Sequence, residues 1–292
     1  MPAILSVRAI KRKVRSVGNI KKITRAMQMV SAAKLKKVQV RLMELRPYSD
    51  KIREFLQSLA SQVKDLNYPL FQPREKVRKI GIVAVMADKG LCGSYNSNMM
   101  RHVQRFLDEQ KKPYVAIAVG KKSAEWFRKQ GTPLRAEYLQ LPTEIPFSQI
   151  KAMTKQLVEL FLSQEVDEVH LLFTRYVNAM TFKPGSVKFL PIEPEQKGSA
   201  LSKEYEFEPE PERILDRLIP RYVEVSFHRL LLESMSSEHA ARMNAMRNAT
   251  DSASDLISAL TLQYNNARQA GITKELLDIV GGAEALRQAV EA

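Results

Sequence analysis

The chain has 292 residues, enough for one large domain or for a globular domain with an extended element. A hydrophobic fraction of 45% and a charged fraction of 27% are typical of a folded soluble protein and exclude a disordered or fibrous chain. The single cysteine, Cys92, excludes an intramolecular disulfide, and no apolar run approaches the roughly 20 residues that span a bilayer, so no direct membrane insertion is expected.

The first segment, residues 3–46, is predicted to form a long helix with a basic surface. Its apolar residues recur at steps of three and four, as on one helix face: Ile10, Val14, Val17, Ile20, Ile23, Met27, Val30 and Ala33. Residues 1–46 hold thirteen Lys or Arg and one acid, Glu44, so this segment carries +12 (13 − 1) of the formal net charge of +14. That imbalance implies an acidic partner surface. Pro47 is expected to end or kink the helix, and the apolar pattern continues to about Lys64.

The middle of the chain, after a proline-marked linker near Pro69 and Pro73, alternates strand and helix patterns. Short apolar runs predict strands at 80–87, 114–119, 134–139, 168–176 and 187–192, the last two joined by a turn near Pro184-Gly185. Amphipathic stretches predict helices at 98–110, 121–129 and 148–163. This alternation is typical of a mainly parallel sheet with helices packed on it.

The last segment is predicted to be a second long helix. A stretch rich in Pro and Glu, residues 192–213, leads into it, and residues 221–270 contain no Gly and no Pro. Its apolar or small residues again follow steps of three or four: Met243, Met246, Ala249, Ala253, Leu256, Leu260, Tyr264 and Ala267. A helix this long needs a partner along its length, and the first helix can supply it. We therefore expect a Rossmann-like α/β domain, residues 75–210, inserted between two long helices, residues 1–64 and 211–292, that form an antiparallel coiled coil.

Motifs for catalysis are weak. The four His and Cys92 show no metal-ligand spacing, so neither a metal nor a cofactor is expected. The loop at residues 88–96, DKGLCGSYN, follows a strand but matches neither common phosphate-binding glycine motif, and Lys89 at its tip has no evident catalytic partner. The basic first helix leaves two alternatives open, an acidic protein surface or nucleic acid, although it lacks aromatic residues that would stack on bases.

Three long stretches resemble the γ subunit of F-type ATP synthases of the bacterial type. They are IKRKVRSVGNIKKITRAMQMVSAAKLKKVQ near the start, DKGLCGSYN in the middle, and SEHAARMNAMRNATDSASDLISALTLQYNNARQAGITKELLDIVGGAEAL near the end. The resemblance covers essentially the whole chain. The competing interpretation is a basic coiled-coil protein that binds nucleic acid.

The resemblance implies a non-catalytic rotor shaft. In this family the terminal helices form a coiled coil inside the hexamer of α and β subunits, and the α/β domain sits with the ε subunit on the ring of c subunits. Proton flow turns the ring, and the shaft drives each β subunit through its conformations so that ATP is made or hydrolysed there. The expected location is the cytoplasmic face of the cell inner membrane, held peripherally through the complex, with no nucleic acid bound.

The resemblance also implies contacts with the β subunits. Arg268 and Gln269 match a pair that hydrogen-bonds a β-subunit loop. Lys89 falls where many members have Arg, so the positive charge is kept but bidentate hydrogen bonding is lost. Met27 and its neighbours Lys21, Lys22 and Arg25 match the helix portion near an acidic lever of β. Thr273 and Glu275 match a polar cluster opposite it, and the apolar end, residues 276–286, matches a tip held in a hydrophobic sleeve.

Overall fold

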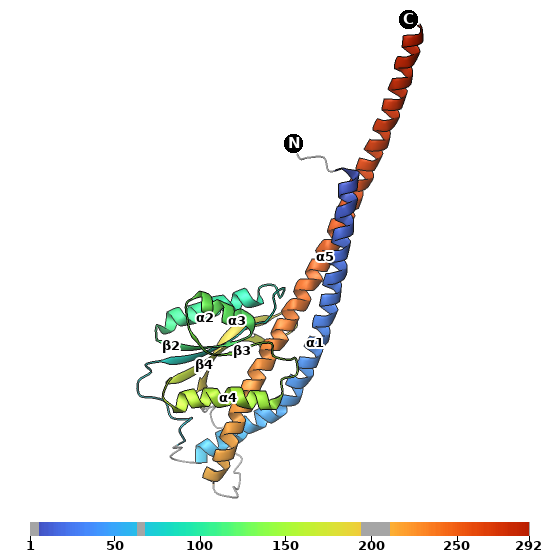
Figure 1. Ribbon diagram of the computed structural model, residues 1–292. Helices are drawn as coiled ribbons and strands as arrows, with labels where there is room; N and C mark the ends of the chain where they lie inside the picture. Colours follow the sequence, from blue (N-terminus) through green and yellow to red (C-terminus); the bar gives the residue numbers. More distant parts are fainter. Residues whose placement is uncertain (1–5, 63–67, 194–210, 292) are drawn as a thin grey trace. The chain divides into compact units, whose positions relative to one another are not determined.

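Two long helices stand at the two ends of the chain, as the sequence predicts. The computed structural model describes residues 6–62, 68–193 and 211–291. The helix α1 covers Val7–Gln62 and α5 covers Pro211–Glu291, with 56 and 81 residues (Figure 1). Among the described helices, none combines the length and the apolar character that crossing a membrane requires.

Neither long helix ends at its internal proline. The helix α1 continues through Pro47, and α5 continues through Pro220. A proline inside a helix costs one backbone hydrogen bond and crowds the preceding turn, about 3 kcal/mol or more. The residues that follow Pro47 offset this cost by packing, since Ile52 and Leu56 are both buried in the main hydrophobic core.

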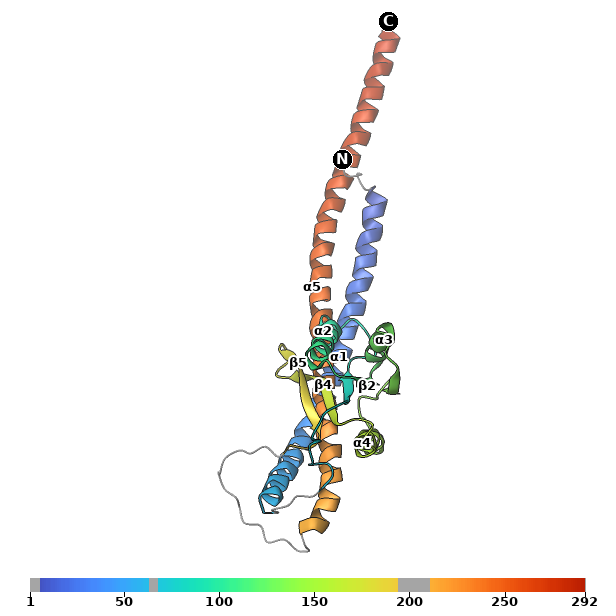
Figure 2. The ribbon, with the colours of Figure 1, turned by 90° about the vertical axis from the view of Figure 1, so that its left-hand side faces the viewer.

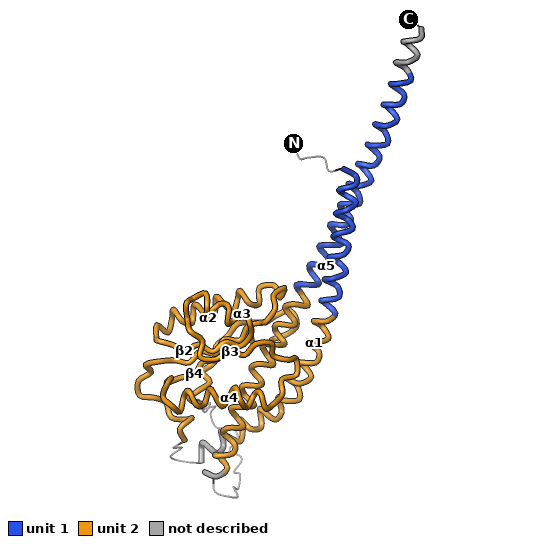
Figure 3. Tube along the Cα trace, viewed as in Figure 1, with its two compact units in different colours: residues 1–29, 245–292 blue, residues 30–244 orange. Residues whose placement is uncertain are grey.

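The chain divides into two compact units, which Figure 3 shows in different colours. The first unit comprises residues 1–29 and 245–292 and is a pair of helices that run in opposite directions (Figures 1 and 2). Thr250 hydrogen-bonds Thr24 across the pair at 2.8 Å, and both side chains are buried. Along α5 the buried positions Met246, Ala253 and Leu260 are spaced by seven residues, the repeat of a coiled coil.

The second unit, residues 30–244, contains the sheet and the remaining parts of both long helices. Here too the helices are antiparallel, because residues later in α1 contact residues earlier in α5. Val38 and Leu42 pack against Leu232, and farther along α1, Ser49 accepts a hydrogen bond from Arg229 at 3.3 Å. The predicted antiparallel pairing of the two helices is therefore confirmed within each unit.

The sheet has five strands in the order β3-β2-β1-β4-β5. They are β1 (Ile80–Val85), β2 (Tyr114–Val119), β3 (Leu134–Tyr138), β4 (Glu168–Tyr176) and β5 (Phe182–Leu190). The first four are parallel, and β5 is antiparallel to β4. The central strand β1 pairs on both sides, with Ile82 opposite Ala116 of β2 and His170 of β4. The predicted, mainly parallel sheet is confirmed.

The turn between the last two strands lies elsewhere than predicted. Pro184 and Gly185 are inside β5, where they pair with Thr174 and Phe173, and the chain reverses at residues 177–181. The sequence favoured a turn because Pro and Gly are common in turns. β5 is an edge strand, however, where a residue without an N–H can lie with its unpaired side outward.

Helices cover both faces of the sheet, as Figure 1 shows for α2 (Tyr95–Gln110) and α3 (Lys121–Lys129) on one face and α4 (Phe147–Leu162) on the other. Alternate residues of β1 face the two layers. Ile82 and Ala84 belong to the core with α2 and α3, while Val83 and Val85 belong to the core with α4, α1 and α5. Each fully buried apolar side chain of this kind stabilises the fold by roughly 1.5–3 kcal/mol.

Candidate functional site

The loop after β1 is held by backbone contacts at the carboxyl end of the sheet. Asp88 accepts the backbone N–H groups of Lys121 at 2.9 Å and Gln140 at 3.0 Å. Gly120 has φ +88°, and an added Cβ would lie 2.0 Å from the carbonyl oxygen of Met86. Only glycine lets the backbone at residue 120 come so close to Met86, and this contact fixes where the loop after β1 begins.

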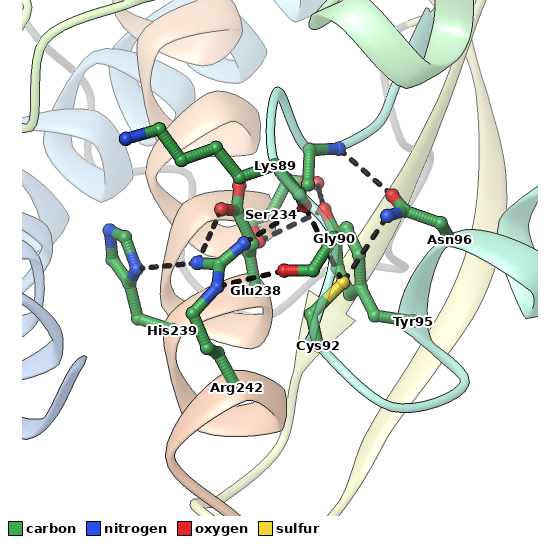
Figure 4. Close-up of polar contacts among 10 residues, drawn as sticks. Lys89, Gly90, Cys92, Tyr95, Asn96, Ser234, Glu238, His239 and Arg242 are labelled. Atoms are coloured by element: carbon green, nitrogen blue, oxygen red, sulfur yellow. Dashed lines mark hydrogen bonds and ion pairs between the residues drawn. The ribbon is translucent and has the colours of Figure 1, made fainter. Parts of the chain in front are cut away.

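Arg242 of α5 clamps the tip of this loop (Figure 4). Its guanidinium donates to the backbone carbonyls of Lys89 at 3.1 Å and Gly90 at 3.3 Å. The same group forms an ion pair with Glu238 at 2.7 Å, one helical turn earlier, and lies 3.4 Å from Nδ1 of His239. The rigid fork of an arginine can serve several acceptors at once, so one side chain joins the loop to the helix.

The residues of this clamp are buried, and burial shifts the pKa values of Glu238 and His239. The side chains of Glu238 and Arg242 are only 17% and 11% exposed. Burial raises the pKa of Glu238, and the adjacent Arg242 acts in the opposite direction. Burial, together with the cations Arg242 and Lys34, lowers the pKa of His239 to about 4, so its imidazole is neutral at pH 7.

A second set of contacts fixes the base of the loop. The hydroxyl of Tyr95 lies 2.9 Å from Oγ of Ser234 in α5. Asn96 accepts the backbone N–H of Ala87 at 3.0 Å and donates to Sγ of Cys92 at 3.2 Å. Burial raises the pKa of the Cys92 thiol, so it stays protonated and is a poor nucleophile.

The contacts of this cluster hold the loop against α5, so the role of the cluster is structural. Within the described ranges, no three His, Cys, Asp or Glu side chains are grouped so that they could hold a metal ion. The Lys89 side chain is exposed and points away from the clamp in Figure 4, while its backbone carbonyl is the part bound by Arg242. The sequence predicted Lys89 at the tip of this loop, without a catalytic partner, but it did not reveal the contacts of Arg242. The only local signal is the four-residue spacing of Glu238 and Arg242.

The basic residues predicted on the first helix lie on α1 in the first unit. Lys21, Lys22 and Arg25 are exposed, and Met27 is half-buried. Thr24, between them, is turned inward to Thr250. The cations are therefore presented to the outside of the helix pair, as a partner contact requires.

The residues predicted near the end of the chain, Arg268, Gln269, Thr273 and Glu275, are all exposed on α5 in the first unit. Thr273 lies 23 residues beyond Thr250, the position that faces Thr24, which corresponds to roughly 35 Å along a helix. The structure therefore places Thr273 and Glu275 apart from the Met27 region. Lys89 belongs to the other unit.

Comparisons with known proteins agree over nearly the full length. The sequence profile of the family described as ATP synthase matches residues 6–286. The ATP synthase gamma chain of Heliobacterium modesticaldum is 42% identical over 288 residues, covering 96% of this chain and 99% of that protein. The gamma chain of Symbiobacterium thermophilum is 42% identical over 282 residues, covering 96% and 98%.

Solved structures share the fold. A chain of the Euglena gracilis mitochondrial ATP synthase, in a structure of OSCP, F1 and the c-ring, matches with a TM-score of 0.69 at 20% identity, covering 98% of this chain and 96% of that one. A chain from the central stalk and c-ring of the Tetrahymena thermophila enzyme matches with a TM-score of 0.58 at 24% identity, covering 78% and 99%.

The fold defines the class: an α/β sheet domain lies between two long helices that are antiparallel within each unit. The particular family follows from the comparisons: the chain belongs to the ATP synthase gamma-chain family. Gamma chains are the non-catalytic rotor subunits of ATP synthases, so this chain associates with other ATP synthase subunits and is not itself an enzyme.

Proposed function

We propose that this chain is the central rotor shaft of a proton-translocating F-type ATP synthase. It couples rotation of the membrane c ring to conformational change at the β-subunit sites, where ATP is synthesised or hydrolysed. The observation that carries the proposal is the family match over residues 6–286, which includes both long helices and the sheet. Residues 1–64 and 211–292 act as the coiled coil, and residues 75–210 act as the foot domain.

The shaft works by contacting three β subunits differently. A rotating element changes the affinity of a site only if it interacts unequally with the site's open and closed conformations. The paired helices of the first unit supply stiffness, since apolar contacts and the Thr24–Thr250 hydrogen bond join them. The outward basic side chains then contact different β subunits as the shaft rotates.

We assign the partner contacts to residues that the fold leaves accessible. Arg268 and Gln269 hydrogen-bond a β-subunit loop, and Lys21, Lys22 and Arg25 lie against an acidic β segment beside Met27. Thr273, Glu275 and Lys89 provide further polar contacts. The exposure of all these side chains except the half-buried Met27 supports the assignment.

The far part of α5 carries a further argument for a surrounding partner. Leu276, Leu277, Ile279 and Val280 are 58–68% exposed, although they are large and apolar. A continuous apolar surface of this kind marks a binding surface. A hydrophobic sleeve formed by the α and β subunits would cover it.

The foot domain binds the ε subunit and the c ring, which places the chain at the cytoplasmic face of the cell inner membrane as a peripheral subunit. Affinity capture of the tagged chain from native membranes tests this arrangement. We expect α, β, ε and c subunits in a fixed ratio. Recovery of the chain without α and β would contradict the proposal.

Arg268→Ala tests the β contact. One lost charge-assisted hydrogen bond of about 1.5–3 kcal/mol should reduce coupled ATP synthesis by roughly 10- to 100-fold in the assembled enzyme, without changing the nucleotide affinity of isolated β. Arg247→Ala, at another exposed arginine of α5, is the matched control and should leave synthesis unchanged. Normal synthesis by the Arg268→Ala enzyme would refute the contact.

Filter binding of duplex DNA across a salt series tests the competing function. A nucleic-acid protein with this basic helix would bind tightly at low salt and lose affinity steeply as salt rises. We expect weak binding by the assembled complex, because the basic side chains of α1 then face protein.

A further inference from the structure

A cavity of about 600 Å³ lies within the second unit, away from the Arg242 clamp. Its walls come from α1, α5, β4 and β5, together with Phe71 from the segment before the sheet and Ile192 and Glu193 from the segment after it. This volume is in the range of pockets that hold small organic ligands, about 300–1,000 Å³.

The cavity has an excess of positive charge. Five cationic side chains line it, Arg46, Arg53, Arg175, Lys188 and Arg229, against two carboxylates, Glu193 and Glu233. Both carboxylates are already engaged by cations of the same wall. Lys188 binds Glu193 at 2.6 Å, and Arg229 binds Glu233 at 3.4 Å.

The other three arginines have no such partner. The side chains of Arg46, Arg53 and Arg175 form no hydrogen bond or ion pair with any residue in the described part of the chain. Arg46 and Arg53 are separated by seven residues of α1, two helical turns, so both side chains lie on one face of that helix. Arg175 reaches the same cavity from β4.

Aromatic and apolar groups form the rest of the wall. Phe71 and Tyr222 are half-buried, and Phe173 and Phe189 are buried at 2% and 8% exposure. Tyr176 is fixed by a hydrogen bond from Gln39 to its hydroxyl at 2.6 Å. The pocket therefore offers flat apolar surfaces beside unpaired guanidinium groups.

We propose that this cavity binds an organic phosphate with a planar apolar body, of the size of a mononucleotide. The forks of Arg46, Arg53 and Arg175 hold the phosphate, since guanidinium groups bind phosphate oxygens in pairs. The ring of the ligand packs against Tyr222 and Phe71, as bases stack on aromatic side chains. This site is separate from the rotor contacts and does not depend on them.

Calorimetric titration of the full chain at low salt tests the proposal with three probes. Adenosine monophosphate should saturate one site per chain, while inorganic phosphate and adenosine each bind at least tenfold more weakly, because each lacks half of the recognised chemistry. Absence of saturation by adenosine monophosphate would overturn the proposal. Equal binding of either fragment would overturn it too.

Variants locate the site. Arg53→Gln and Tyr222→Leu should each weaken binding of adenosine monophosphate about tenfold. Arg41→Gln is the control, because Arg41 is exposed on α1, is paired with Glu44 and does not line the cavity. Urea unfolding of each variant checks the fold. Wild-type affinity in a folded Arg53→Gln chain, or the same loss in Arg41→Gln, would refute the assignment.

Discussion

The guanidinium of Arg242 in α5 donates a hydrogen bond to the backbone carbonyl of Lys89 in the loop after β1, at 3.1 Å. The two residues are 153 positions apart in the chain. This contact fastens the loop that ends the central strand to the long C-terminal helix, and Glu238 balances the buried charge that it requires.

Arg242→Ala should strongly destabilise the second unit. The substitution removes both contacts to the loop and leaves Glu238 buried without its cation, and breaking a buried pair in this way costs about 3–5 kcal/mol. Urea unfolding of the full chain, followed by circular dichroism, measures the loss. Arg247→Ala on the exposed surface of α5 should stay within about 0.5 kcal/mol of the wild type. A similarly small effect of Arg242→Ala would show that the clamp contributes nothing to stability.

The lowered pKa of His239 should make the stability of the folded chain depend on pH. Its pKa is lowered from 6.5 to about 4, so the unfolded chain binds a proton between these values and the folded chain does not. Stability should therefore fall as pH decreases through this window, by about 2 kcal/mol for this group between pH 7 and pH 5. The raised pKa of Glu238 acts in the opposite direction, since the folded chain holds that proton to higher pH.

The pKa values of three other histidines are also lowered, so these residues change stability with pH in the same direction as His239: His102, His170 and His228. The contribution of His239 must therefore be isolated by substitution. Urea midpoints at pH 7 and pH 5, compared between the wild type and His239→Gln, provide this measurement. The variant should show the smaller loss on acidification. Equal losses would mean that His239 titrates normally in the folded chain.

The hydrogen bond between Thr24 and Thr250 can be tested by a double-mutant cycle. Thr250→Val alone removes one hydroxyl and leaves its buried partner without that bond, a cost of about 1–3 kcal/mol. Replacing both threonines by valine should cost less than the sum of the two single changes, because each single change already removes the hydrogen bond that the two residues share. Thermal unfolding of the full-length variants gives the coupling energy. Strict additivity would show that the bond does not join the two helices.

Leu277→Asp should separate folding from assembly. Leu277 is 66% exposed, so the substitution should change the stability of the isolated chain by less than about 0.5 kcal/mol. It should nevertheless weaken reconstitution with α and β subunits, because a charge would enter the proposed hydrophobic sleeve. Leu232→Asp, at a position 1% exposed, is the contrasting variant and should unfold the second unit. Normal assembly of the Leu277→Asp chain would argue against the sleeve.

The sequence predicted those features that depend on local patterns. The strand at Ile80–Val85 and the helix at Lys121–Lys129 follow from apolar runs and helical spacing alone. The turn was misplaced because Pro184 is tolerated at a sheet edge, and the edge position of β5 is a property of the whole sheet. The Arg242 clamp and the arginine-lined cavity join residues more than 100 positions apart, so no local pattern could reveal them.

The central claim is that this chain turns inside a ring of catalytic subunits. Lys151 is exposed on α4 and Cys92 is buried, so a Lys151→Cys chain can be labelled selectively with a bead in a complex whose α and β subunits are fixed to a surface. Single-molecule microscopy with ATP should show the bead rotating continuously in one direction. A bead that stays still while the same complexes hydrolyse ATP would contradict the account.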